Sequence, residues 1–224
     1  MNKKLKEFIY QHPGFIRIII KIINKLPFNN KIHIKFGNKI KNSALLRSCK
    51  IVIKGKNNEI VIGDYTRLIH SSISIYGNNN KVIIGSNCFF YETDIHIEDF
   101  NGTISIGKNT SICGKTHLAC IEGKAIEIGE NCLFSSDIVV RTGDSHSILN
   151  MDEKRTNPSM DVYVGNHVWV GNRVIVLKGS VIENNSIVAT GSIVTKKFNE
   201  GNVILGGNPA KVIKENIKWT GERL

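Results

Sequence analysis

Residues 81–109 read KVIIGSNCFFYETDIHIEDFNGTISIGKN, and this stretch contains the pattern that decides the fold. The pair Ile84-Gly85 returns as Ile106-Gly107, 22 residues later, and an asparagine follows two residues after the glycine in both copies. The same isoleucine-glycine pair stands 22 residues before and after, at positions 62 and 128. A fixed period of this length predicts a repeat protein.

The second half of the chain repeats with a shorter period. Val164-Gly165 and Val170-Gly171 lie six residues apart, and the spacing continues through Val176, Ile182 and Val188. Since 22 is three sixes plus four, both halves fit a three-sided coil with one inward aliphatic residue on each side. Stacked coils pair as parallel strands and bury a continuous core. Glycine and asparagine near the corners tolerate positive φ.

The four extra residues of each early coil should bulge at one corner. Polar or glycine-containing segments suited to this stand at 76–81, 99–103 and 121–125. Residues 31–58 should hold one or two imperfect starting coils, as expected of a cap.

This repeat resembles that of the hexapeptide-repeat acyltransferases, over about residues 60–217, and is closest in style to sugar and capsular polysaccharide O-acetyltransferases. The resemblance implies an all-β solenoid, specifically a left-handed parallel β-helix, which is an exception to the right-handed crossover rule. It also implies acetyl-CoA as acyl donor and a homotrimer. No metal is expected.

The domain organisation follows from where the repeat stops. We expect an N-terminal helical segment over 1–30, the β-helix over 31–217 with an extruded loop at about 141–163, and a short C-terminal tail over 218–224. The helical segment has an apolar stripe from Phe15 to Leu26 and a basic face, with Pro13 suited to its first turn. Such a helix can lie on an acidic membrane, or dock on the solenoid end or in an oligomer contact.

Composition narrows the partners. The net charge of +11 favours anionic partners, but aromatic residues are only 7% and no basic run is interleaved with them, so nucleic acid is not expected. Five cysteines without CxxC pairs are expected to be buried thiols in a reducing compartment. Charges inside the N-terminal apolar run argue against a signal peptide, so we expect a cytoplasmic protein, with contact at the inner membrane face as an option.

Acyl transfer from a thioester to an alcohol needs a base, oxyanion donors and positioning of two substrates. Histidine is the natural base because its pKa lies near neutral. His146 stands at the start of the extruded loop, where the resemblance places the catalytic histidine of sugar acetyltransferases. Asp144, or a backbone carbonyl, is a candidate to orient its ring. The alternative is a solvated loop histidine.

The resemblance assigns further residues to the acceptor side. Trp169 lies 23 residues after His146, an interval that resembles that of the acetyltransferases of capsular and sialic-acid glycans, in which this tryptophan lies near the reacting hydroxyl. The alternative is that its indole packs beneath the loop. Asp137 falls where sugar acetyltransferases often place an asparagine near the acetyl group.

The coenzyme A side also rests on resemblance. VATGSIVTK at 188–196 looks like the family's GAGSxVTK signature, with Ala189 and Thr190 in place of glycine and alanine, and GNPAKVIK at 207–214 resembles GxPAKVIR. The implied cofactor-binding residues are Asn172, Ala189, Thr190, Thr195, Lys196, Lys211 and Lys214. Lysines suit the nucleotide phosphates; the alternative is a solvated basic tail.

The sequence therefore predicts an acetyl-CoA-dependent O-acetyltransferase acting on a sugar or glycan hydroxyl, the glycan being acidic and capsular or part of a lipopolysaccharide. One alternative is an N-acetyltransferase of an amino sugar nucleotide or small amine. Another is a non-catalytic solenoid or a metal-dependent hydratase like the γ-class carbonic anhydrases. His70, His96 and His117 could stack on neighbouring coils as metal ligands, but they lack that family's five-residue ligand spacing.

Overall fold

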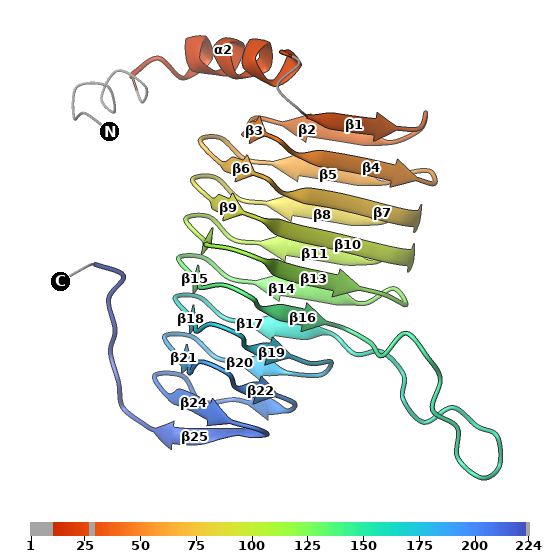
Figure 1. The fold of residues 1–224 in the computed structure, drawn as a ribbon, viewed down its shortest axis with the longest axis vertical. Coiled ribbons are helices and arrows are strands. Elements are labelled where there is room, and N and C mark those ends of the chain that lie inside the picture. The colour runs from red at the N-terminus through yellow and green to blue at the C-terminus, as the bar shows by residue number, and fades with distance from the viewer. Residues whose placement is uncertain (1–10, 27–29, 223–224) are drawn as a thin grey trace.

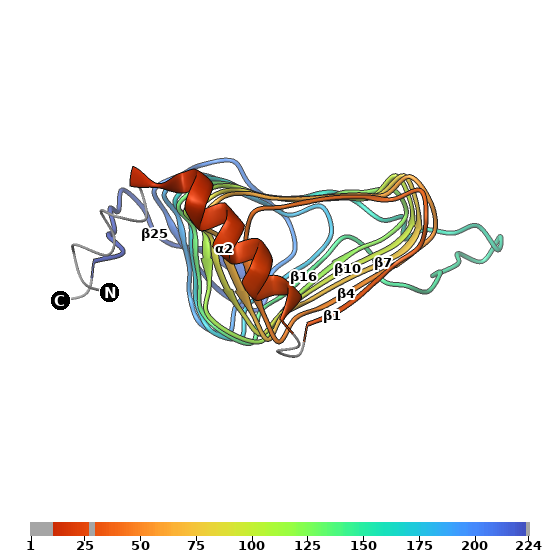
Figure 2. The same cartoon turned by 90° about the horizontal axis from the view of Figure 1, so that it is seen from above.

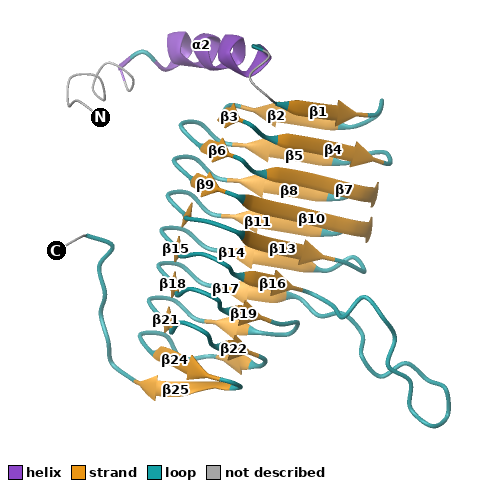
Figure 3. Cartoon of the chain, in the orientation of Figure 1, coloured by secondary structure: helices purple, strands orange, loops and turns teal. Residues whose placement is uncertain are grey.

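The predicted β-solenoid is confirmed. In the computed structural model, which describes residues 11–26 and 30–222, three parallel sheets wrap around one core and a helix covers the first coil (Figure 1). Viewed along the stack, the coils superpose into an elongated three-sided outline (Figure 2). Strands make up nearly all the regular structure (Figure 3).

Each coil contributes one strand to each sheet in turn. Sheet A consists of β1 (Lys31–Ile34), β4 (Lys50–Lys54), β7 (Ser72–Asn78), β10 (Thr93–Phe100), β13 (Thr116–Cys120), β16 (Val139–Arg141), β19 (Ile175–Val176) and β22 (Ile193–Val194). Sheet B consists of β2 (Lys39–Asn42), β5 (Glu59–Ile62), β8 (Lys81–Ile84), β11 (Thr103–Ile106), β14 (Ala125–Ile128), β17 (Val162–Val164), β20 (Val181–Ile182) and β23 (Lys197–Phe198). Sheet C consists of β3 (Leu45–Arg47), β6 (Arg67–Ile69), β9 (Phe89–Tyr91), β12 (Ser111–Ile112), β15 (Leu133–Phe134), β18 (Trp169–Val170), β21 (Ile187–Val188), β24 (Ile204–Gly207) and the antiparallel β25 (Ala210–Lys214).

The repeating aliphatic residues form the core. Ile62, Ile84, Ile106, Ile128 and the valines that follow them in the six-residue rhythm are each at most 3% exposed. Pairing at a constant offset explains this, since Ile62 pairs with Ile84, and Ile84 with Ile106, in parallel register. Burial of these side chains supplies the main stabilisation of a solenoid.

Asparagine and glycine have different roles at the corners of the coils. The asparagines of the repeat do adopt positive φ, at 58° for Asn87 and 57° for Asn131. The repeat glycines do not adopt positive φ. A Cβ on Gly85 would lie 2.5 Å from the backbone nitrogen of Lys108 on the next coil, so this glycine is required by the close approach of successive coils.

The extra residues of the early coils lie where predicted. All three segments occupy the corner between sheets A and B, where strands β7 and β10 reach seven and eight residues. The later sheet A strands β19 and β22 have only two residues each. The solenoid therefore narrows toward its C-terminal end, and the extruded loop leaves from this same A–B corner (Figure 1).

Helix α2 (Pro13–Lys25) covers the N-terminal end of the solenoid. The side chain of Asn24 fixes it there, because its amide donates to the carbonyl of Ala44 and its oxygen accepts from the backbone N–H of Leu46. Of the placements considered for this helix, the structure shows contact with the solenoid end. Residues 1–10 and 27–29 of the predicted helical segment 1–30, and residues 223–224 of the predicted tail, lie outside the described residues. No helix in the described ranges is long and apolar enough to cross a membrane.

Candidate active site

The extruded loop, residues 142–161, is organised around the side chain of Asn157. This residue is 7% exposed. Its amide donates to the Asp144 carboxylate and to the carbonyl of His146, both at 2.8 Å, while its oxygen accepts from the N–H of Ile148 at 2.7 Å. One buried amide thus holds both sides of the loop together at the position of the predicted base.

Two ion pairs tie the loop to the solenoid. Lys178, on the coil below, pairs with Asp144 and also donates to the carbonyl of Asn157. Arg155 pairs with Glu122 at the A–B corner, with 2.7 Å between Nη2 and Oε1. These hydrogen bonds lower the pKa of the Asp144 carboxyl, mainly through Lys178, and that of Glu122, mainly through Arg155.

His146 projects from this anchored loop as an exposed side chain. The expected pairing with Asp144 is not present, because the Asp144 carboxylate is bound by Lys178 and Asn157 instead. Within the described residues the imidazole of His146 has no hydrogen-bond partner, so it is available to a substrate hydroxyl. Asp144 instead links the loop that carries the imidazole to Lys178 on the next coil.

Trp169 lies elsewhere, on the outer face of sheet C, and the residue is 39% exposed. It lines a cavity of about 520 Å³ together with Cys113, Ser135, Asn172 and Trp219. The indole therefore does not pack beneath the loop. A wide cavity with an aromatic wall and a few polar groups is the usual form of a small-molecule site.

The C-terminal tail builds the opposite wall of this cavity, which the sequence did not predict. The indole of Trp219 packs 6.0 Å from that of Trp169 and its Nε1 donates to the carbonyl of His167 at 3.0 Å. A tryptophan within a mostly polar tail was the available signal, because a large aromatic residue is rarely left fully in solvent.

Asp137 and Asn172 lie together at the corner between sheets C and A. Asp137 adopts φ 58° and its carboxylate accepts from Ser136 Oγ at 3.3 Å, while Asn172 Oδ1 accepts from the backbone N–H of Ser136 at 3.1 Å. Ser136 and Asn172 both line the Trp169 cavity. Trp169, predicted to lie near the acceptor, and Asn172, predicted to bind coenzyme A, therefore line the same cavity.

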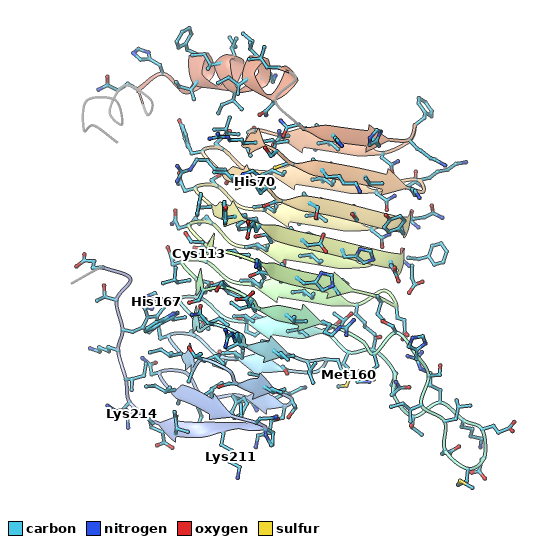
Figure 4. The ribbon with its side chains drawn as sticks, viewed as in Figure 1. His70, Cys113, Met160, His167, Lys211 and Lys214 are labelled. Carbon is cyan, nitrogen blue, oxygen red and sulfur yellow. The ribbon has the colours of Figure 1, made fainter. Side chains whose placement is uncertain are left out.

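The other predicted cofactor-binding residues are distributed along the last coils. Ala189 and Thr190 follow β21 at the C–A corner, one coil beyond Asn172. Thr195 and Lys196 lie on the A–B side, where the ammonium of Lys196 stands 5.3 Å from the centre of the Phe198 ring. Lys211 and Lys214 lie exposed at the C-terminal end (Figure 4). One chain therefore does not bring this set into a single cluster.

His146 and Trp169 also lie on different sides of one chain. Figure 4 shows Cys113 and His167, which flank the Trp169 cavity, along one edge of the solenoid, and Met160, at the foot of the loop, at the other edge. The view along the stack agrees, with the loop projecting away from β25 of sheet C (Figure 2). The two halves of the predicted site are thus at similar heights but on separate faces.

Comparison with known proteins decides the family. The chain is 33% identical to a polysialic acid O-acetyltransferase of Neisseria meningitidis over 181 residues, which are 80% of this chain and 83% of that protein. The chain belongs to the hexapeptide-repeat sugar O-acetyltransferases. No protein-family model matches it.

Two further comparisons of this acetyltransferase agree. The crystal structure of the polysialic acid O-acetyltransferase OatWY superposes with a TM-score of 0.79 and 30% identity, covering 87% of this chain and 92% of that one, and the predicted left-handed β-helix is confirmed by this match. A polysialic acid O-acetyltransferase of Escherichia coli is 41% identical over 95 residues, a match that spans 42% of this chain and only 31% of that protein.

In the described part of the chain, no group of three or more histidine, cysteine or acidic side chains is placed to hold a metal ion. His117 Nδ1 bonds Asp94 Oδ2 at 2.8 Å and His96 Nε2 bonds Glu98 Oε1 at 2.9 Å, so each ring is held by a carboxylate. Among the cysteines, four are buried and Cys113 is exposed. Burial raises the thiol pKa at the buried positions, which makes them poor nucleophiles.

Proposed function

We propose that this acetyltransferase transfers the acetyl group of acetyl-CoA to a hydroxyl of a sialic-acid-containing, acidic glycan. The observation that carries the proposal is the likeness to polysialic acid O-acetyltransferases over four fifths of the chain. The net charge of +11 supports an anionic acceptor, since a field of that sign concentrates negatively charged chains at the surface.

The reaction needs a single displacement at the thioester. His146 accepts the proton of the acceptor hydroxyl as its oxygen attacks the acetyl carbon, the tetrahedral intermediate collapses, and the coenzyme A thiolate leaves and takes up the proton. A positioned base of this kind contributes about 10²–10⁴-fold in rate. The exposure of the imidazole and the anchoring of its loop by Asn157 support this role.

The working enzyme is proposed to be a trimer with shared active sites. The separation of His146 from the Trp169 cavity supports this, because a neighbour can bring its loop to the cavity of the next chain. The loop is suited to such a contact, since its apolar side chains are uncovered: Ile148 is 59% exposed, Leu149 54% and Met151 100%. In the proposed trimer these side chains would be covered by the neighbouring chain.

Acetyl-CoA is then proposed to lie between the chains. Asn172, Ala189 and Thr190 would line its pantetheine arm on one chain, and Thr195 and Lys196 would face it from the next. Lys196, Lys211 and Lys214 suit its phosphates, because within the described residues none of the three is engaged in an ion pair and all are exposed.

The outer face of α2 is proposed to touch an anionic membrane. Phe15, Ile18 and Ile22 follow one another at helical spacing and are each more than half exposed. In a trimer whose axis runs along the solenoids, three such helices would stand at one end and bind a bilayer together, which multiplies a weak single contact.

The proposed function is tested by following coenzyme A release with oligosialic acid, neutral hexose oligomers and amino sugars as acceptors. We expect release with oligosialic acid and a product whose acetyl group is removed by mild base, as an ester is. Release with amino sugars alone, giving a base-stable amide, would contradict it. Sedimentation analysis of the same sample tests the trimer, and a catalytically active monomer would exclude shared sites.

A further inference from the structure

A second, smaller cavity lies on the outer face of sheet A and takes no part in the steps above. Its volume is about 200 Å³ and it is open to solvent. Its walls come from three successive coils and from the foot of the extruded loop: His96, Glu98, His117, Ala119, Arg141 and Ser145. Because Ser145 directly precedes His146, this cavity adjoins the proposed base.

Arg141 is the unusual member of this set. It is half-buried at the end of β16, and its Nε is fully buried without a hydrogen-bond partner. Within the described residues no carboxylate lies within 4 Å of its guanidinium. Buried donors are nearly always paired in native proteins, so the unpaired Nε of Arg141 points to a missing acceptor. A carboxylate is the acceptor that the planar guanidinium fits best.

The sheet leaves room for that acceptor. In parallel register, His96 pairs with Ala119 and Ala119 with Arg141, so these three outward side chains form one row across sheet A. Alanine is the small member of the row, and it opens a gap between the imidazole and the guanidinium. The 200 Å³ of space above it suits one sugar ring.

The other polar groups of the cavity are suited to sugar hydroxyls. Glu98 and Asp94 are each bound to an imidazole, at 2.9 and 2.8 Å, and the rings of His96 and His117 lie 6.3 Å apart. Each ring therefore keeps its second nitrogen for a ligand. Imidazole nitrogens and carboxylate oxygens exchange hydrogen bonds readily with hydroxyl groups. Among the described residues Arg141 makes no ion pair within 4 Å, and Asp144, which interacts with it at longer range, is bound to Lys178 and Asn157.

We propose that this cavity binds one acidic sugar of the acceptor, with its carboxylate on Arg141 and its hydroxyls on His96, His117 and Glu98. The proposal rests on the proposed function and adds to it a recognition subsite. A sugar held here would place the neighbouring part of the same glycan beside His146. Arg141 is a binding residue in this scheme, since it touches the acceptor away from the reacting hydroxyl.

The test measures acceptor binding without acetyl-CoA, so that it does not depend on turnover. Calorimetric titrations compare oligosialic acid with the same oligomer after reduction of its carboxylates to alcohols. The proteins are the wild type, Arg141→Gln, and the matched control Arg47→Gln, which removes an exposed arginine on sheet C. Thermal unfolding of each variant confirms that it is folded.

We expect wild type and Arg47→Gln to bind the acidic oligomer about 10- to 100-fold more tightly than the reduced one, the usual effect of a hydrogen-bonded charge pair. Arg141→Gln should bind both oligomers equally weakly, because either change alone removes the same contact. A folded Arg141→Gln that keeps the preference would overturn the assignment, as would a wild type without any preference.

A failure of the proposed function would give a different set of results from a failure of the subsite. If wild type prefers the acidic oligomer and Arg141→Gln does not, but no acetyl transfer occurs with any acceptor, the subsite stands and the enzymatic proposal fails. A His96→Gln variant gives a second measurement. It should lower the affinity for both oligomers to a similar degree, and the preference for the acidic oligomer should remain. Unchanged binding of both oligomers by this variant would remove His96 from the subsite.

Discussion

The indole of Trp219 lies flat on the imidazole of His167, with ring centres 4.0 Å apart and planes 5° from parallel. The same indole donates a hydrogen bond to the carbonyl of His167, and its ring lies 6.0 Å from that of Trp169 with the two planes tilted by 42°. Two residues 52 positions apart in the chain thus fix the C-terminal tail over sheet C. The tail becomes one wall of the largest cavity described above.

Loss of this stack should open the Trp169 cavity. We expect Trp219→Ala to raise KM about 3- to 10-fold for the substrate that the cavity binds, because an aromatic pair contributes about 0.5–1.5 kcal/mol beyond its buried area. Trp219→Phe should remain near wild type, since it keeps a ring over His167. Steady-state kinetics for both substrates check this, and equal behaviour of the two variants would contradict it.

His146 should carry the chemical step. His146→Ala is expected to lower kcat by about 10²–10⁴-fold, as removal of a general base does, without changing the affinity for acetyl-CoA. His33→Ala, an exposed histidine on β1, is the matched control and should keep the wild-type rate. Should His146→Ala turn over as fast as the control, the base must be sought elsewhere.

The Asp144–Lys178 pair should hold the loop in its active position. Lys178→Met removes the cation from this pair, and we expect kcat/KM to fall by about 10- to 100-fold, since misplacing a catalytic group by an ångström has effects of that size. Lys154→Met, at the tip of the same loop, is the control. Limited proteolysis should cut the loop faster in Lys178→Met alone.

The pH dependence of this anchor has a definite sign. Lys178 and then Asn157 lower the pKa of Asp144, so the folded state favours the charged carboxylate. The ionised Asp144 stabilises the folded loop fully above the unfolded pKa of about 3.9. This stabilisation is lost as the pH falls through the lower pKa of the folded state. Loop protection should therefore be constant from pH 5 to 8 and decrease only in acid. If the loop loses its protection from proteolysis between pH 8 and 6, a group other than Asp144 must hold it.

Cys113 should report occupancy of the Trp169 cavity. It is the exposed cysteine and lines that cavity, whereas burial raises the pKa of Cys120 and Cys132 to about 11. A thiol reagent at pH 7.5 should therefore modify one thiol per native chain, and bound substrate should slow the reaction. Cys113→Ser is the control and should show no fast phase. Labelling that no substrate slows would place both substrates outside this cavity.

The apolar face of α2 should bind membranes. We expect the wild type to sediment with phosphatidylserine vesicles, and the double variant Ile18→Glu, Ile22→Glu to stay in solution because its charges cannot enter the interface. Val212→Glu, at the other end of the solenoid, is the control and should sediment like the wild type. If the double variant sediments as the wild type does, the apolar face of α2 does not bind the membrane.

Much of the fold could be read from the sequence because a solenoid repeats one local rule. Each inward residue pairs with the residue one coil away at a nearly constant offset, so the spacing of Ile62, Ile84 and Ile106 already contained the strand register. The amphipathic stripe from Phe15 indicated the helix, and the interruption of the repeat located the extruded loop. His146 and Trp169 were proposed on the position of that interruption and on family resemblance.

The arrangement of the site was decided by the tertiary structure. The bond from Lys178 to Asp144 spans 34 residues and that from Trp219 to His167 spans 52, and neither separation follows the repeat. Pairs of this kind form wherever folding brings complementary groups together, so no periodic pattern in the sequence predicts them. The same reason explains why the gap over Ala119 and the unpaired Nε of Arg141 became visible only once the coils were stacked.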